Sequence, residues 1–464
     1  MNAKTPLVRF IAPAYPNENI FSRIARRMTP LGLIMVATAA CDWNRWRVEV
    51  IDENDYTGPR TKDGLPDHEK LQEENPAEIV AFYCGLTCTM DRVYELARFY
   101  QNRGAKVIAG GKHVMHRTEE ALGNCIDAVV IGEGERIIQD VLSAIRDGGF
   151  LQSIFYAPLP ETQGYDKNLD LLPYPDYGLV RYAKVKCYSI GRVRGCSMFC
   201  EFCTVNDKPR WSSPEHLFNT VRWLVDTRGA RNFFIVDDNL GEDIEGYTKF
   251  FQMVKAKFGN RLCFTVQIRL SLAHNSEFLT IMKEAGGWAV CVGFESVLDQ
   301  ELKAMHKGLT SRQMLNWART LSKMFWLHMM FIYRYPGKNQ EELLVSDKER
   351  ERRHKWFIRK SGGHSIQILQ LVPLPGSNVE KRLKEEGRLI PVEQSCLDGV
   401  FVCYVPRNIS IEGLHQAQMR LMRWFYSPMS FWWRVFTFLP LGLIRLISNW
   451  NASKRAWRQA VIKY

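Results

Sequence analysis

Short runs of consecutive apolar residues alternate with amphipathic stretches through the first third of the chain. Amphipathic periodicity predicts helices between the apolar runs, for example at Met90–Gln101 and Arg136–Arg146. Alternating strands and helices are typical of a parallel sheet with right-handed crossovers. Residues 1–150 are therefore expected to form a doubly wound, Rossmann-like α/β domain. Its predicted strands are Leu7–Ile11, Val48–Ile51, Ile79–Tyr83, Lys106–Ala109 and Ala128–Ile131.

The carboxyl ends of these strands carry glycines and hydroxyl side chains. Doubly wound sheets bind ligands in the crevice outside those ends, and glycine lets the backbone approach a bulky ligand closely. The chain contains neither G-x-G-x-x-G nor G-x4-G-K-[ST], which disfavours a dinucleotide site or a P-loop. The candidate ligand-binding residues are Thr87, Thr89, Gly110, Gly111, Gly132, Glu133 and Gly134.

A second alternating series follows residues 151–186, a stretch rich in proline and aspartate that predicts an interdomain linker. One helix of this series has a clear start at Ser213-Pro214-Glu215 and a stop at Gly229. Six β/α units over residues 187–390 predict a partial barrel, whose functional residues should lie at the carboxyl ends of its strands. The predicted strands are Lys186–Gly191, Asn232–Val236, Cys263–Ile268, Ala289–Phe294, Leu327–Tyr333 and Ser365–Leu371.

Three cysteines with C-x3-C-x2-C spacing, Cys196, Cys200 and Cys203, follow the first barrel strand. A [4Fe–4S] cluster normally takes four thiolates, so three from one loop would leave one iron open for chemistry. Two other interpretations exist. Half of a zinc site is one, although zinc usually takes two separated pairs of ligands. Buried free thiols are the other.

The cysteine motif resembles the signature of the radical S-adenosylmethionine (SAM) enzymes. In that family the open iron chelates SAM, and one electron from the cluster cleaves SAM to a 5′-deoxyadenosyl radical. The resemblance implies an electron donor such as flavodoxin or ferredoxin. Similar residues at the next strand ends imply a SAM pocket, in which Arg269 would offer a bidentate fork to a carboxylate. The implied SAM-binding residues are Phe202, Asp237, Asp238, Gln267, Arg269, Glu295 and Ser296. Asp and Ser at such positions are also usual helix caps.

The strand-end loops of the first domain, with Thr29–Leu33 ahead of them, resemble the cobalamin-binding domain that precedes many radical SAM cores. The corrinoid fingerprint D-x-H-x-x-G is absent, and residues 12–29 contain no histidine. Any cobalamin is therefore expected to bind base-off and His-off. His113 is the nearest candidate ligand, although a loop histidine is more often structural.

The segment Leu371–Ser377 resembles the end of the core in cobalamin-dependent radical SAM proteins, and Tyr426-Ser427-Pro428 resembles the tail of the hopanoid methylases and their relatives. This resemblance implies methylation of an unactivated carbon, with methylcobalamin as the methyl donor and SAM as the source of the radical. The substrate would be a small, lipid-like molecule. A non-methylating cyclase of the anaerobic porphyrin cyclase type stays open as the alternative.

The formal net charge of +12 favours anionic partners, either nucleic acid or an anionic membrane. No acidic residue follows Glu412, and this end of the chain contains Trp432, Trp433 and the apolar segment Val435–Ile444. That segment is too short to span a bilayer but suits an interfacial one. We expect a mostly helical extension over residues 391–464 that contacts an anionic membrane surface. Packing of this segment on its own domain is the competing interpretation.

Other partners and sites are less favoured. A nucleic-acid modifier such as a tRNA methylthiotransferase would carry a second cysteine triad, but Cys41, Cys84, Cys88 and Cys125 do not group in that way. No nucleic-acid partner is therefore expected, and an iron–sulfur electron carrier is disfavoured by the missing fourth ligand. Cysteines without paired spacing predict a reducing cytoplasm. The basic, tryptophan-rich end of the chain adds the expectation that the enzyme is peripheral on the inner face of the membrane. The sequence does not specify an oligomeric state.

Overall fold

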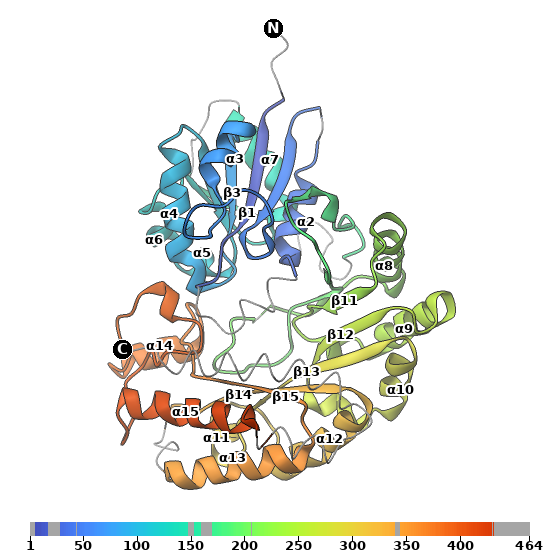
Figure 1. Ribbon diagram of the computed structural model, residues 1–464, viewed down its shortest axis with the longest axis vertical. Coiled ribbons are helices and arrows are strands. Elements are labelled where there is room, and N and C mark those ends of the chain that lie inside the picture. Colours follow the sequence, from blue (N-terminus) through green and yellow to red (C-terminus); the bar gives the residue numbers. More distant parts are fainter. Residues whose placement is uncertain are drawn as a thin grey trace.

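The computed structural model describes residues 5–16, 28–42, 44–146, 153–158, 169–205, 207–338, 344–428 and 430. It contains two parallel sheets, one in the upper, blue half of Figure 1 and the other in the green to orange half below it. The predicted class, a doubly wound domain followed by a partial barrel, is confirmed.

The N-terminal sheet has the strand order β6-β5-β4-β3-β1-β2-β7 among the described residues, with all pairs parallel. Alternate residues of β1 enter different cores: Val8 and Phe10 pack with α2 and α7, while Leu7 and Ile11 pack with α4. The chain runs from β1 to β2 on one side and then to β3 on the other, which makes a switch-point crevice at the carboxyl ends of β1 and β3. The elements are β1 (Leu7–Ala12), α2 (Leu31–Ala39), β2 (Arg47–Asp52), η1 (Glu53–Asp55), α3 (His68–Glu74), β3 (Ile79–Tyr83), η2 (Thr87–Thr89), α4 (Met90–Gln101), β4 (Lys106–Gly110), α5 (Lys112–His116), α6 (Thr118–Leu122), β5 (Ala128–Ile131), η3 (Gly134–Arg136) and α7 (Ile138–Arg146).

Two edge strands of this sheet lie inside residues 151–186, the stretch assigned to a linker on sequence. β6 (Ile154–Tyr156) extends one edge beside β5, and β7 (Val180–Arg181) pairs with β2 at the other. Both are too short to produce a recognisable alternation of apolar and polar residues. The connection between the domains therefore returns along the first domain before it enters the barrel.

The second sheet has the order β15-β14-β13-β12-β11-β8 among the described residues, also all parallel. The six predicted barrel strands are confirmed. So are the limits of α8, because the Ser213 hydroxyl accepts from His216 N–H and Gly229 ends the helix at φ +63°. The elements are β8 (Tyr188–Ile190), β9 (Val193–Arg194), β10 (Arg210–Trp211), α8 (Pro214–Arg228), β11 (Asn232–Ile235), η6 (Leu240–Glu242), α9 (Ile244–Phe258), β12 (Cys263–Ile268), η7 (Leu270–His274), α10 (Ser276–Glu284), β13 (Gly287–Glu295), α11 (Asp299–Ala304), α12 (Ser311–Met324), β14 (Trp326–Ile332), α13 (Asp347–Ser361) and β15 (Ser365–Leu369).

After β15 the chain continues through α14 (Asn378–Glu385) and then enters the C-terminal extension, which contains η9 (Gln394–Cys396) and α15 (Ile411–Phe425). It touches both domains. The Tyr426 hydroxyl donates to Ile366 O at 2.7 Å in the barrel, and Gln394 donates to Glu120 at 3.2 Å in the first domain. None of the described helices is long and apolar enough to cross a membrane. The expected interfacial segment, with Trp432, Trp433 and Val435–Ile444, lies outside the described residues.

Candidate functional site

The cysteine loop is fixed by backbone bonds to the segments around it. Gly195 adopts φ +86°, and a Cβ there would lie 2.6 Å from Asp207 O, so the turn requires glycine. Gly195 N–H donates to the Asp238 carboxylate at 2.7 Å, and Ser197 N–H donates to Glu242 at 2.9 Å. Both carboxylates follow β11. The barrel therefore holds the loop across the end of its second strand.

All three cysteines of the loop are half-buried, and nearby charges act on them. Burial raises the pKa of Cys196 and Cys200, whereas the positive charge of Arg269 lowers both and that of Lys307 lowers the pKa of Cys200. Negative cluster thiolates would be stabilised by the same two cations. No three His, Cys, Asp or Glu side chains in the described part of the chain converge on a single-metal site. Three thiols without a fourth ligand fit a cluster in which each thiolate binds a different iron.

Several predicted SAM residues come together near the cysteines. Phe202 packs edge-on against Tyr335, with ring centroids 6.3 Å apart. Glu295 ends β13 at a register shift with φ +62° and pairs with Lys307 at 3.0 Å. Asp238 and Gln267 are exposed, and Arg269 is half-buried. Phe202 lies in the cysteine loop, and the other four side chains lie at the carboxyl ends of β11, β12 and β13, as expected for a pocket at the barrel mouth.

Asp237 and Ser296 lie in the wall of the barrel instead. Asp237 is 5% exposed, accepts from Arg192 N–H at 2.7 Å and bonds to the Tyr247 hydroxyl. Ser296 is fully buried, donates to Glu301 and accepts from Leu298 N–H at 3.1 Å. Both side chains are engaged inside the protein, so the structure gives them a supporting position behind the site.

Sequence reasoning missed Glu201, which lies between the second and third cysteines. Its carboxylate is buried and accepts from Tyr335 at 2.5 Å and from Arg382 at 2.8 and 3.1 Å. Arg382 lies on α14, so this pair ties the cysteine loop to the helix that follows the last barrel strand. Nothing in the spacing of the motif signals this contact. The same is true of the pair between Glu295 and Lys307.

We expect Glu201→Ala to reduce the iron content of the protein strongly. Removing one partner of a buried ion pair costs about 3–5 kcal/mol, because the other charge is left uncompensated. The measurement is iron per chain after anaerobic reconstitution, together with thermal unfolding. Glu201→Gln keeps the shape and one acceptor oxygen, and should load more iron than Glu201→Ala. Full iron loading of Glu201→Ala would contradict a positioning role.

The first-domain loops lie opposite the cysteine loop. Lys112, which begins α5, pairs with Asp207 of the barrel at 3.3 Å, and Asp207 O accepts from Cys196 N–H at 3.1 Å. The carboxyl ends of both sheets therefore face each other, as the arrangement in Figure 1 shows.

Thr87, Thr89 and His113 are buried beside this edge. Thr87 and Thr89 are each 4% exposed, and Thr89 donates to Leu86 O at 2.8 Å. His113 Nδ1 lies 3.1 Å from the Thr87 hydroxyl, while Nε2 lies 3.4 Å from Glu120. Burial lowers the pKa of His113. Its ring thus joins the loop after β3 to α6.

The candidate cobalamin-binding glycines differ in whether the protein's own packing requires glycine at that position. A Cβ on Gly111, at φ +133°, would lie 2.5 Å from the Cys84 carbonyl carbon, and one on Gly132, at φ +96°, would lie 2.9 Å from Ala157. Both glycines are thus needed by the protein itself. A Cβ on Gly134 would meet Val36 at 3.1 Å, whereas one on Gly110 would have 3.8 Å to its nearest neighbour. Gly110 leaves the most room for a ligand.

Glu133 is an interdomain anchor. Arg210 and Arg194 of the barrel lie 2.6 and 2.9 Å from its carboxylate, and Arg136 of its own domain lies at 2.9 Å. Burial raises the pKa of Glu133, but the two barrel arginines outweigh it and lower the pKa to about 2. A lowered pKa makes this contact fully stabilising above the ordinary value of 4.5, and the contribution fades as the pH falls toward 2.

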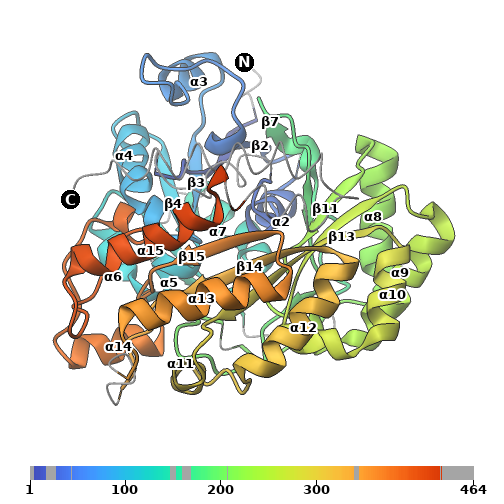
Figure 2. The same ribbon diagram turned by 60° about the horizontal axis from the view of Figure 1, so that its bottom comes forward.

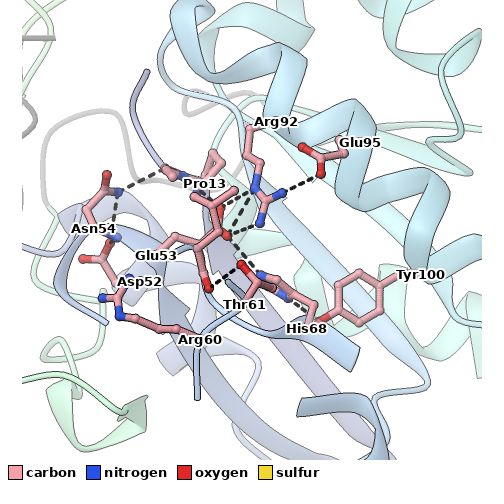
Figure 3. A network of polar contacts seen from close by, with 12 residues as sticks. Pro13, Asp52, Glu53, Asn54, Arg60, Thr61, His68, Arg92, Glu95 and Tyr100 are labelled. Carbon is pink, nitrogen blue, oxygen red and sulfur yellow. Dashed lines mark hydrogen bonds and ion pairs between the residues drawn. The ribbon is translucent and has the colours of Figure 1, made fainter. Parts of the chain in front are cut away.

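The loop that leaves β1 at the switch point is held by a buried polar network (Figure 3). Glu53 accepts from Ala14 N–H at 2.8 Å and from Arg92 at 2.6 Å, and His68 lies 3.1 Å away. Asn54 donates to Pro13 O at 3.0 Å. Burial raises the pKa of Glu53, but His68 and Arg92 outweigh it and lower the pKa to about 2. The loop start is therefore fixed by a carboxylate that is charged at neutral pH.

Two domain families match the two halves of this structure. The family described as B12 binding domain matches residues 20–142, and the Radical SAM superfamily matches residues 190–348. The chain is a radical SAM enzyme with a B12-binding domain. The expected cofactors, cobalamin, SAM and a [4Fe–4S] cluster, agree with both matches.

Known relatives of this radical SAM enzyme include methyltransferases. A Pyrococcus horikoshii protein named uncharacterized methyltransferase PH0819 is 26% identical over 395 residues, which cover 78% of this chain and 80% of the relative. The hopanoid C-2 methylase of Rhodopseudomonas palustris is 24% identical over 401 residues, covering 81% and 68%. The fold is similar to that of the methyltransferase TsrM from Kitasatospora setae, solved with cobalamin and a [4Fe–4S] cluster bound. Its TM-score is 0.64 at 15% identity, with 82% and 78% of the chains covered.

Proposed function

We propose that this radical SAM enzyme methylates an unactivated carbon of an apolar, lipid-like molecule. The observation that carries the proposal is the facing of the two sheet edges, joined through Lys112 and Asp207 at 3.3 Å. A substrate between these edges would lie within reach of both cofactor sites. The named activities of the relatives support methyl transfer over other radical chemistry.

The cofactors supply the hydrogen-abstracting radical and the methyl group, and the chain supplies binding, orientation and exclusion of water. Cys196, Cys200 and Cys203 would hold the cluster. Arg269 would bind the SAM carboxylate, for which its planar fork is suited. Asp238, exposed after β11, would accept from the SAM ammonium group, and Glu295, kept in place by Lys307, would line the same pocket.

Cobalamin would lie against the loops after β3, β4 and β5, at Gly110 and its neighbours. His-off binding is supported by the position of His113, which is 2% exposed, with Nδ1 3.1 Å from the Thr87 hydroxyl. An electron donor such as flavodoxin or ferredoxin would reduce the cluster.

Exposed apolar side chains on the facing loops support an apolar substrate. Phe199, within the cysteine loop, is 75% exposed, and Leu86, in the loop after β3, is 39% exposed. A contiguous exposed apolar surface marks a ligand-binding groove or an interaction site, and we propose that these two side chains belong to one such surface. A substrate with a hydrocarbon surface would cover them and displace water from the site.

The test is methyl transfer from SAM that carries a trideuteriomethyl group. The anaerobically reconstituted enzyme is incubated with reductant, cobalamin and either the lipid or the water-soluble extract of its source cells. We expect the label in a lipid product, with 5′-deoxyadenosine and S-adenosylhomocysteine both formed. Formation of 5′-deoxyadenosine without S-adenosylhomocysteine would favour the cyclase alternative. Label confined to the water-soluble fraction would overturn the apolar substrate.

A further inference from the structure

The positive charge of the chain is concentrated in three helices and the C-terminal segment. α12 has three basic and no acidic residues, α13 has seven and three, and α15 has two and one, so these helices hold +8 of a formal net charge of +12. Residues 431–464 add six basic and no acidic residues. The rest of the chain is therefore close to neutral overall.

These three helices lie side by side on one outer face of the barrel, below the first domain in Figure 1 and in front in Figure 2. Their apolar sides face inward, since Phe357 and Ile358 of α13 are buried. Most of the basic side chains face outward: Arg352 is 71% exposed, Arg353 46% and Arg420 51%. Glu349 pairs with the first two and Glu351 with the third, while Arg350 is buried against Glu301. We name this surface, made by α12, α13 and α15, the basic face.

Tryptophan is interspersed with these charges. Trp356 of α13 is 52% exposed, which is unusual for so large an apolar side chain on a charged helix. Trp424 of α15 lies under two cations, with Lys355 Nζ 5.7 Å and Arg359 Cζ 5.1 Å from its ring. Tryptophan and basic residues together are typical of surfaces that meet a lipid headgroup layer.

We propose that the basic face docks the enzyme on an anionic lipid bilayer. Charge complementarity favours a polyanionic partner, and the exposed indole favours a bilayer, since Trp prefers the interface between headgroups and hydrocarbon. The chain leaves this face through α15 directly into its tryptophan-rich, acid-free C-terminal residues. The docking site is thus a rigid helical surface, continuous along the chain with a segment of the same chemistry. This inference does not depend on methyl transfer.

Vesicle sedimentation of the full-length protein tests the proposal without turnover. Vesicles of phosphatidylcholine alone are compared with vesicles that also contain phosphatidylglycerol, at low and high salt. The variant Arg352→Gln/Arg353→Gln/Arg420→Gln removes three exposed charges from the basic face. The control Arg222→Gln/Lys255→Gln/Lys257→Gln removes three exposed charges from α8 and α9, on another side of the barrel.

The wild type and the control should bind anionic vesicles alike, whereas the basic-face variant should bind about tenfold to a hundredfold more weakly. High salt should release the wild type. Equal losses in both variants would show a bulk charge effect and overturn the proposal. Unchanged binding of the basic-face variant would assign docking to the C-terminal residues instead. Tighter binding to transfer RNA than to anionic vesicles, lost in the basic-face variant, would replace the bilayer with nucleic acid.

Discussion

Replacing Cys196, Cys200 and Cys203 together with alanine is expected to abolish iron–sulfur absorbance and SAM cleavage while the fold stays intact. The three cysteines are only half-buried and do not belong to the hydrophobic core of the barrel, so the substitutions remove little packing. The loss is chemical, because no other thiolate can bind the irons in this loop. Iron content and 5′-deoxyadenosine formation are the measurements, with circular dichroism to monitor folding.

A matched control replaces three half-buried cysteines outside the loop, Cys41, Cys187 and Cys263. This variant should keep its iron and cleave SAM like the wild type. The assignment of the cluster would be wrong if the loop variant still bound close to four irons per chain and produced 5′-deoxyadenosine.

The sequence predicts the main strands of the first sheet well because they are buried on both faces. Strands such as β3, where all five residues are apolar and four are buried, appear as continuous apolar runs that turns interrupt. β6 and β7 escape detection because strands of two or three residues have no periodicity to recognise. Their place in the sheet depends on pairing with β5 and β2, which is tertiary information.

The sequence predicts those site residues whose spacing along the chain is fixed by their chemistry. It does not predict whether a side chain at a strand end points toward a ligand or into the protein. The spacing of three cysteines on one loop is enough to indicate a site for an iron–sulfur cluster. A strand-end Asp or Ser, by contrast, has the same sequence context whether it faces a ligand or the protein interior. Asp237 and Ser296 turn inward because Tyr247 and Glu301 offer them buried partners. Those partners come from later helices, so strand patterns alone cannot place them.

Glu133 shows the same limit across two domains. Its position after β5 suggests a cobalamin contact. Its carboxylate instead pairs with two barrel arginines, Arg194 just before the cysteine loop and Arg210 just after it. We propose that Glu133 acts by positioning the first domain over the barrel. The distance between the two cofactor sites would then depend on this carboxylate.

Glu133→Ala is accordingly expected to uncouple the two halves of the reaction. The cysteine loop and the SAM pocket are built by the barrel, so SAM cleavage to 5′-deoxyadenosine should persist. Methylated product should fall by about 10²-fold, because a displacement of about 1 Å between reacting groups costs that much. The measurement is the ratio of methylated product to 5′-deoxyadenosine, with cobalamin binding measured separately.

Glu119→Ala is the matched control, since it removes one exposed carboxylate from the same domain. Its product ratio should equal that of the wild type. Loss of cobalamin binding in Glu133→Ala, with an unchanged product ratio in the cobalamin-loaded fraction, would make Glu133 a cofactor contact instead. If both the product ratio and cobalamin binding were normal in Glu133→Ala, Glu133 would have no role in the reaction. Only a lowered ratio of methylated product to 5′-deoxyadenosine at full cobalamin occupancy supports a positioning role. In that case cobalamin is bound, and the loss of product comes from where it lies.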